Sequence, residues 1–215
     1  MTRGLIILGT GGSAYDVLDI VEGLNAKSPA WQVIGFLDDA RPAGSRYLEL
    51  PVLGGLREAA RFADCWFINV IGSDASHRRR AEIIQSTGLP PDRFATLVHP
   101  QASVSRWARL GRGVYVSFGA SIGGGVLVGD HVAFSPACVI GHDSVFAEFA
   151  LVAPRAVVSG FVRVGRCCYI GAGAMIRQKL QIDDGALVGL GAVVTKNVRA
   201  GTTVVGNPAR ELVRA

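Results

Sequence analysis

The sequence predicts a small α/β domain with a parallel sheet, followed by a parallel β-helix. Three observations carry this prediction. Apolar residues recur every six positions through the second half of the chain, the first half alternates strand-like and helix-like segments, and 28 of the 215 residues are glycine. The glycines follow no three-residue period and accompany many aliphatic residues, which excludes collagen and disordered chains.

The six-residue period begins after His99-Pro100. Each of the sixteen residues spaced by six from Val104 to Val194 is large and apolar, and thirteen of the residues that directly follow them are Gly, Ala or Ser. Such a hexapeptide repeat is typical of a coil of about 18 residues with three short strands, whose aliphatic side chains point inward. We therefore expect just over five coils, with residues 18 apart stacked on one another.

The first half reads as strands and helices in alternation. Short apolar runs predict strands over residues 5–8, 33–37 and 66–71, and helical spacing predicts helices over 15–24 and 76–86. Residues 40–55 are rich in Pro and Gly and are expected to form a loop. This order indicates a small parallel sheet.

Composition excludes several other classes of protein. The chain shows no signal peptide and no run of about 18 apolar residues, and its four cysteines lack metal-site spacing, so we expect a soluble cytoplasmic protein without a metal or membrane partner. Residues 1–99 carry a net charge of −1 and residues 100–215 a net charge of +6. The basic residues are scattered without interleaved aromatics, which favours a polyphosphate ligand over a nucleic acid.

Several motifs together resemble the NeuD/PglD-type sugar acetyltransferases. They are Ile7-Leu8-Gly9-Thr10-Gly11-Gly12, Gly35-Phe36-Leu37-Asp38-Asp39, His99-Pro100, Ile140-Gly141-His142-Asp143 and Val205-Gly206-Asn207-Pro208-Ala209-Arg210. The resemblance implies a Rossmann-like domain over residues 1–98 that binds a nucleotide-sugar. It also implies a left-handed β-helix acetyltransferase domain over residues 99–215, assembled as a homotrimer with active sites between subunits.

His142 is the candidate catalytic base. It falls at a corner of the repeat, and the residues one coil away are Gly124 and Gly160, which leave space around the imidazole. Imidazole suits the removal of a proton near neutral pH. The resemblance assigns the base to His142, a supporting role to Asp143 and the oxyanion donor to the Gly160 N–H. Because neighbours on an extended segment point apart, we expect the help from Asp143 to be indirect or to cross subunits.

The resemblance also implies two ligand sites. For acetyl-CoA, we expect Lys196 and Arg210 to bind the phosphates, with Arg177 and Lys179 as further candidates. For the acceptor, a glycine-rich loop after the first strand is typical of phosphate binding, and the expected contacts are Gly11, Gly12, Ser13, Asp38, Asp39, Gly72 and Ser73. The consecutive arginines at 78, 79 and 80 are expected to form a solvated helix face.

The predicted function is acetyl-CoA-dependent acetylation of a sugar, at the amino group of a nucleotide-linked amino sugar. Family members carry histidine where this chain has Ser13 and Leu151, which leaves open sialic-acid-type O-acetylation or a catalytically degenerate nucleotide-sugar-binding scaffold. A metal-dependent hydratase resembling γ-carbonic anhydrase would need three convergent histidines, and the β-helix has His131 and His142. A covalent cysteine mechanism is disfavoured because Cys138 and Cys168 fall on the inward register.

Overall fold

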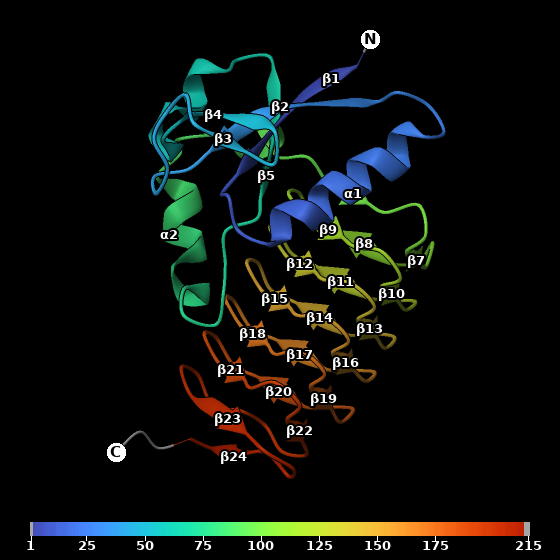
Figure 1. Ribbon diagram of the computed structural model, residues 1–215. Helices are drawn as coiled ribbons and strands as arrows, with labels where there is room; N and C mark the ends of the chain where they lie inside the picture. Colours follow the sequence, from blue (N-terminus) through green and yellow to red (C-terminus); the bar gives the residue numbers. More distant parts are fainter. Residues whose placement is uncertain (1, 213–215) are drawn as a thin grey trace.

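The computed structural model describes residues 2–212, which form a twisted N-terminal sheet above a long three-sided prism (Figure 1). The N-terminal sheet has the strand order β3-β4-β2-β1-β5. Its centre is parallel and consists of β1 (Arg3–Leu8), β2 (Trp31–Leu37) and β5 (Cys65–Asn69). Helix α1 (Ser13–Asn25) joins β1 to β2 and buries Val17, Ile20 and Val21. The three predicted strands and the first helix are thus confirmed.

The expectation of a loop over residues 40–55 is wrong. The segment contains β3 (Arg46–Tyr47) and β4 (Leu50–Gly54), which pair with each other antiparallel, while β4 also pairs parallel with β2. Leu48 and Glu49 form the turn with φ values of 47° and 62°. This conformation normally signals itself by Asn-Gly or Asp-Gly, so a turn built from Leu-Glu gives no sequence signal.

Short helical turns complete the N-terminal half. A 3₁₀ helix, η1 (Leu56–Arg61), follows β4. The helix expected over residues 76–86 is present as η2 (His77–Arg79) continued by α2 (Arg80–Gln85), and η3 (Pro91–Arg93) leads into the prism.

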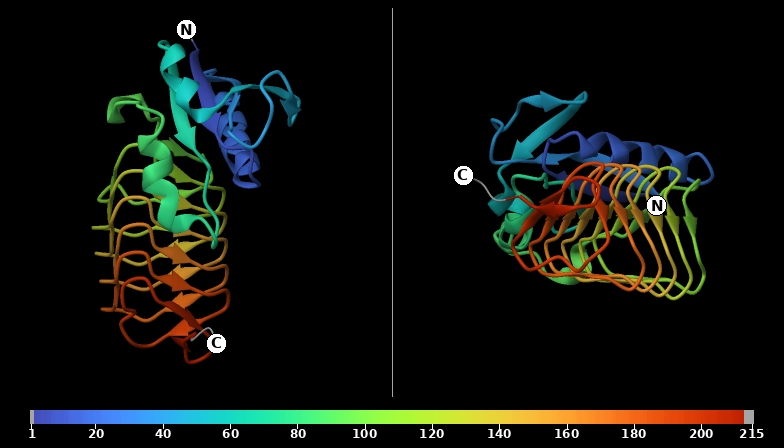
Figure 2. Two further views of the ribbon diagram at one scale, coloured as in Figure 1. Left: turned by 90° about the vertical axis from the view of Figure 1, so that its left-hand side faces the viewer. Right: turned by 90° about the horizontal axis from the view of Figure 1, so that it is seen from below.

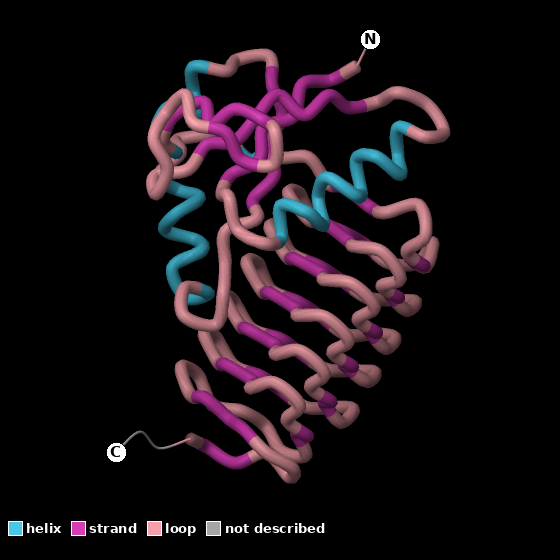
Figure 3. Tube along the Cα trace, in the orientation of Figure 1, coloured by secondary structure: helices cyan, strands magenta, loops and turns pink. Residues whose placement is uncertain are grey.

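The prism consists of three parallel sheets of two-residue strands joined by tight corners (Figure 3). Sheet I contains β7 (Ser103–Val104), β10 (Ser121–Ile122), β13 (Val139–Ile140), β16 (Val157–Val158), β19 (Met175–Ile176) and β22 (Val193–Val194). Sheet II contains β8 (Arg109–Leu110), β11 (Leu127–Val128), β14 (Val145–Phe146), β17 (Arg163–Val164) and β20 (Gln181–Ile182). Sheet III contains β6 (Leu97–Val98), β9 (Tyr115–Val116), β12 (Ala133–Phe134), β15 (Leu151–Val152), β18 (Tyr169–Ile170), β21 (Leu187–Val188), β23 (Thr203–Val205) and an antiparallel β24 (Arg210–Glu211).

The six-residue period produces this prism. Residues 18 apart pair between neighbouring coils, as Ile122 does with Ile140 and Ile140 with Val158. The second residue of each strand points inward, and almost all of these side chains are buried in one continuous core. Figure 2 shows the resulting triangular cross-section from below.

The N-terminal half packs on sheet III. The outward side chains of Tyr115, Ala133 and Leu151 are buried in one cluster with residues of β1 and α1. Helix α2 lies beside the coils (Figure 2), where Ile84 shares a cluster with Phe149 and Cys167 at the corner between sheets II and III. The corner between sheets I and II lies opposite this covered face.

Of the three consecutive arginines, Arg80 is buried, while Arg78 and Arg79 are exposed. Arg80 is 1% exposed and donates hydrogen bonds to the carbonyls of Ile71, Phe149 and Ala150, at 3.0, 2.7 and 3.1 Å. Arg78 donates to the carbonyls of Gly185 and Gly201. The solvated-face expectation is therefore wrong for Arg80, while the exposed Arg78 and Arg79 agree with it. Arg80 is buried because η2 and α2 run along a prism corner whose carbonyls need donors.

Arg80→Ala is expected to lower the free energy of unfolding by about 3 kcal/mol, because it removes the side-chain donor from three carbonyls at the junction. The matched control is Arg79→Ala, whose exposed side chain pairs with Glu82 and whose loss changes stability by about 0.5 kcal/mol or less. Urea unfolding of both variants measures the difference. Equal stabilities would contradict the structural role of Arg80.

Candidate active site

His142 stands on the corner between sheets I and II, in the turn from β13 to β14. We call this edge of the prism the His142 corner; it consists of residues 105–108, 123–126, 141–144, 159–162, 177–180 and 195–196. The ring of His142 lies over Gly160, where a Cβ atom would be 2.9 Å from Nε2. Gly124, on the coil above, has only Ser105 Oγ within 4 Å of such an atom. The two glycines thus clear space on both sides of the imidazole.

Asp143 bonds directly to His142 in the same chain. Its Oδ2 lies 2.9 Å from His142 Nδ1, although both side chains are more than half exposed, at 51% and 62%. The expectation of indirect or cross-subunit help is therefore wrong. Asp143 has a left-handed backbone with φ of 56°, and this corner geometry turns its side chain to the same side as its neighbour, unlike the alternation of an extended strand.

This pairing fixes the chemistry of the imidazole. A carboxylate accepts the Nδ1 proton, so the neutral ring carries its lone pair on Nε2. Nε2 faces the coil of Gly160, on the open side of the corner. The arrangement is that of an oriented general base.

Phe161 is a neighbour of the base that the sequence analysis missed. Its ring meets the His142 ring edge to face at 5.0 Å between centroids. The Nζ atom of Lys179, one coil below Phe161, lies 6.0 Å from the centroid of the Phe161 ring. The hexapeptide repeat could have predicted this neighbour, because Phe161 lies 18 residues after Asp143 and therefore stacks beneath it.

The four candidate cofactor residues lie on the C-terminal side of His142. Arg177, Lys179 and Lys196 belong to the same corner, two to three coils below the imidazole, or about 10–14 Å at the usual strand spacing. Lys196 and Arg210 line one pocket of about 240 Å³. A row of cations leading away from the base suits a ligand with phosphates at its far end.

The acceptor-site candidates from the glycine-rich loop lie above sheet III. Gly11 and Gly12 have open space where a Cβ would be, and Ser13 begins α1. Asp38 accepts bonds from the Thr10 N–H and hydroxyl at 2.7 and 2.6 Å, so its carboxylate holds the loop in place. Asp39 accepts from the Leu56 N–H at 2.8 Å and caps η1.

Two further residues of this loop region were not predicted. Arg41 donates to Thr10 Oγ1 at 3.0 Å and lies over the Tyr47 ring at 4.6 Å. Tyr47 in turn reaches the Gly11 carbonyl at 3.4 Å. Both come from the segment that was expected to be a loop, so no pattern connected them to the glycines.

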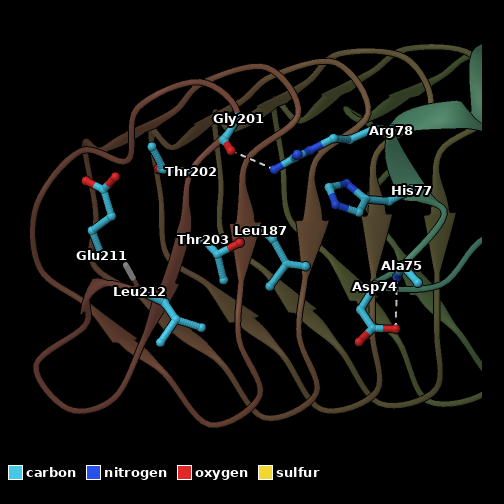
Figure 4. A pocket seen from close by; sticks show the side chains of 10 residues that line it. All are labelled: Asp74, Ala75, His77, Arg78, Leu187, Gly201, Thr202, Thr203, Glu211 and Leu212. Atoms are coloured by element: carbon cyan, nitrogen blue, oxygen red, sulfur yellow. Dashed lines mark hydrogen bonds between the residues drawn. The ribbon is translucent and has the colours of Figure 1, made fainter. Parts of the chain in front are cut away.

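Gly72 and Ser73 lie at the junction with the prism. A Cβ at Gly72 would be 2.9 Å from both Arg80 and Leu151, and the Ser73 N–H bonds to Ser76 Oγ. The next residues line a groove of about 540 Å³ between the N-terminal half and the last strands of sheet III. Figure 4 shows Asp74, His77 and Arg78 facing Leu187 and Thr203 across it, with Arg78 bonded to Gly201.

The candidate residues thus form two separate groups within one chain. The base and three of the cations, Arg177, Lys179 and Lys196, lie on the His142 corner, and Arg210 of β24 lines a pocket with Lys196. The glycine-rich loop, Gly72 and Leu151 lie on the side of sheet III. The triangular cross-section keeps a corner and its opposite face apart.

The alternative chemistries lack suitable groups. The ring of His131 stacks on Phe149 at 4.9 Å and meets Phe94 edge to face at 4.5 Å. Its side chain is buried within its own chain, so it is not available to a site between chains. Within residues 2–212, no three His, Cys, Asp or Glu side chains form a metal-binding cluster. Burial raises the pKa of the Cys138 and Cys168 thiols to about 12, which keeps both protonated and unsuited to nucleophilic attack.

Comparisons with known proteins agree with this geometry. The PglD N-terminal domain family matches residues 4–85. A GDP-perosamine N-acetyltransferase from Escherichia coli O157:H7 is 35% identical over 97% of this chain and 96% of its own length. The chain belongs to the NeuD/PglD-like sugar acetyltransferases.

Solved structures extend the similarity to the whole fold. The acetyltransferase domain of PglB from Neisseria gonorrhoeae FA1090, also solved with acetyl coenzyme A, superposes with a TM-score of 0.83 at 30% identity and covers 98% of this chain and 100% of that one. PerB from Caulobacter crescentus, in complex with CoA and GDP-perosamine, gives 0.82 at 25% identity and covers 99% of both.

These likenesses confirm several predictions. The fold is a Rossmann-like parallel sheet followed by a left-handed parallel β-helix, and the chain is an acyltransferase of the NeuD/PglD-like family that uses acetyl-CoA. The individual site residues stay predictions. No helix within residues 2–212 is both long and apolar enough to cross a bilayer.

For this NeuD/PglD-like acetyltransferase, Asp143→Asn is expected to lower kcat by roughly 10²-fold. The asparagine amide donates to Nδ1 and moves the proton to Nε2, so the base is lost. Asp143→Ala leaves both tautomers accessible and is expected to retain more activity than Asp143→Asn. Steady-state thiol release measures both variants, and an asparagine variant more active than the alanine variant would contradict the tautomer assignment.

His131 makes stability depend on pH. Burial lowers its pKa from 6.5 to about 4, so the unfolded chain binds the proton first and stability falls as the pH drops from about 6.5 toward 4. Replacement by Phe removes this effect, and Phe149 and Phe161 already show that Phe adopts the left-handed backbone of this corner position. Urea unfolding is expected to show that wild type loses roughly 1–2 kcal/mol more than His131→Phe between pH 7 and pH 5. Parallel pH profiles would contradict it.

Proposed function

We propose that this protein transfers the acetyl group of acetyl-CoA to the amino group of a nucleotide-linked amino sugar. The observation that carries the proposal is the His142–Asp143 pair, whose lone pair on Nε2 faces the coil of Gly160. Two relatives of the same family, the GDP-perosamine N-acetyltransferase and PerB, support this substrate class.

The reaction we infer is a direct transfer without an acyl-enzyme. The amine attacks the thioester carbonyl as His142 Nε2 takes its proton, and the Gly160 N–H stabilises the oxyanion of the tetrahedral intermediate. The intermediate then collapses with loss of the CoA thiolate, which receives the proton from the imidazolium. Asp143 holds the ring and balances its transient positive charge.

Acetyl-CoA is proposed to lie along the His142 corner. The cations at 177, 179, 196 and 210 would receive the pyrophosphate and the 3′-phosphate, which places the thioester at the imidazole. Requirement for acetyl-CoA and the presence of four free cysteines support a cytoplasmic location.

The acceptor is proposed to bind to the glycine-rich loop of a neighbouring subunit. Within one chain the loop and the base lie on opposite sides of the prism, so a homotrimer with active sites between subunits brings the two groups together. The outer face of sheet I supports such an assembly, because it carries no charged side chain and exposes Val139 and Met175. Its outward residues are Ser103, Ser121, Val139, Val157, Met175 and Val193.

His142→Ala is expected to lower turnover by 10²- to 10⁴-fold while it preserves CoA binding and the oligomer, because only the proton acceptor is lost. Thiol release from acetyl-CoA with a panel of UDP-, GDP- and dTDP-linked amino sugars measures the activity. Calorimetric titration with CoA and light scattering provide the controls.

Normal turnover in His142→Ala would overturn the proposed mechanism. A wild-type enzyme that acetylates sialic acid but no amino sugar would instead support O-acetylation. Tight binding of nucleotide-sugars without thiol release would support the scaffold function.

A further inference from the structure

The His142 corner opens on the coil above the base. At the three coils below, the N–H at the third corner position bonds to a carbonyl of the preceding coil: Asp143 to Gly124, Phe161 to His142, and Lys179 to Gly160, at 2.9, 2.9 and 3.1 Å. The Gly125 N–H occupies the same position but finds no carbonyl partner among residues 2–212. The first two coils are therefore not joined by this bond at the corner.

Three consecutive glycines line this opening, and it has two distinct walls. The floor is the backbone of residues 123–125. The lower wall is His142 and Asp143, and a Cβ at Gly125 would overlap Asp143 Oδ1. The upper wall is Trp107, which stands two coils above Asp143 on the same ladder.

Trp107 is an exposed aromatic residue next to this opening. Trp107 is among the most exposed of the large apolar residues, with an exposed fraction of 62%. The guanidinium of Arg106 lies 4.6 Å from the centroid of its ring, and the backbone N–H of Trp107 donates to Ser105 Oγ at 3.2 Å. An indole exposed to solvent on the same corner as a candidate base offers a flat apolar surface to a ligand.

We propose that Trp107 determines acceptor specificity by packing against the sugar ring of the acceptor. This inference rests on the proposed function. CoA occupies the side of His142 that leads to the cations, so the acceptor must approach from the other side, where the Gly124 coil is open. A hexopyranose in this opening places its apolar ring face on the indole and a hydroxyl within reach of the unpartnered Gly125 N–H, while its amine extends past the edge of the imidazole to Nε2, which faces the Gly160 coil.

The test compares Trp107→Ala with Phe118→Ala, which removes another exposed aromatic side chain of the same coil but at the corner between sheets III and I, where it contacts His99. With GDP-perosamine and acetyl-CoA, Trp107→Ala is expected to raise the KM for the sugar nucleotide roughly three- to tenfold, with less than a twofold change in kcat and in the KM for acetyl-CoA. Trp107→Phe is expected to recover part of the loss, and Phe118→Ala to behave as wild type.

A binding measurement separates this subsite from catalysis. In the His142→Ala variant, binding of GDP-perosamine is expected to reduce the quenching of tryptophan fluorescence by acrylamide. In the double variant that also carries Trp107→Phe, this reduction is expected to be absent. The subsite alone would be overturned if wild type is active and Trp107→Ala leaves the KM for the sugar nucleotide unchanged. It would also be overturned if Trp107→Ala raises the KM values for the sugar nucleotide and for acetyl-CoA equally, or if it dissociates the oligomer. A wild-type enzyme without turnover on any nucleotide amino sugar would overturn the proposed function instead.

Discussion

The structure depends on one constraint, which is that residues of the β-helix stack on those 18 positions away, up to the last coil, where the offset is 16. Hydrogen bonds between coils fix this register, so the space available to a corner side chain is set by the two residues stacked above and below it. A bulky imidazole stands out from the edge only because Gly124 and Gly160 are its neighbours. The space in which the imidazole can act therefore follows from the absence of side chains at these two neighbours.

The second organising feature is the position of the N-terminal half. Its apolar residues cover the outer face of sheet III, and Arg80 replaces lost water contacts at the junction with hydrogen bonds to three carbonyls. Covering sheet III leaves the opposite corner bare. The base is therefore oriented by local contacts with Asp143 and Phe161, and its distance from the glycine-rich loop is a property of the chain's architecture.

Sequence periodicity was enough to predict the coils, the inward ladder and the glycines around His142, because a fixed repeat places each residue in space without knowledge of any contact. It was not enough where conformation departs from a repeat. The Leu48-Glu49 turn lacks turn residues, so β3 and β4 were missed. The direct bond from Asp143 depends on a left-handed corner, and the burial of Arg80 depends on how two distant parts of the chain meet.

The bonds of Arg78 to Gly185 and Gly201 have a consequence for how such a chain can change in length. They tie residue 78 to coils far below the N-terminal sheet, while Tyr115 is buried against the same half near the top. An insertion of six or twelve residues between Tyr115 and His142 would rotate His142 to another edge of the prism relative to the N-terminal half. Only whole coils preserve the edge, and each shifts one anchor by about 4.8 Å. Deletions and insertions in the β-helix are thus limited both by rotation and by the span of the N-terminal half.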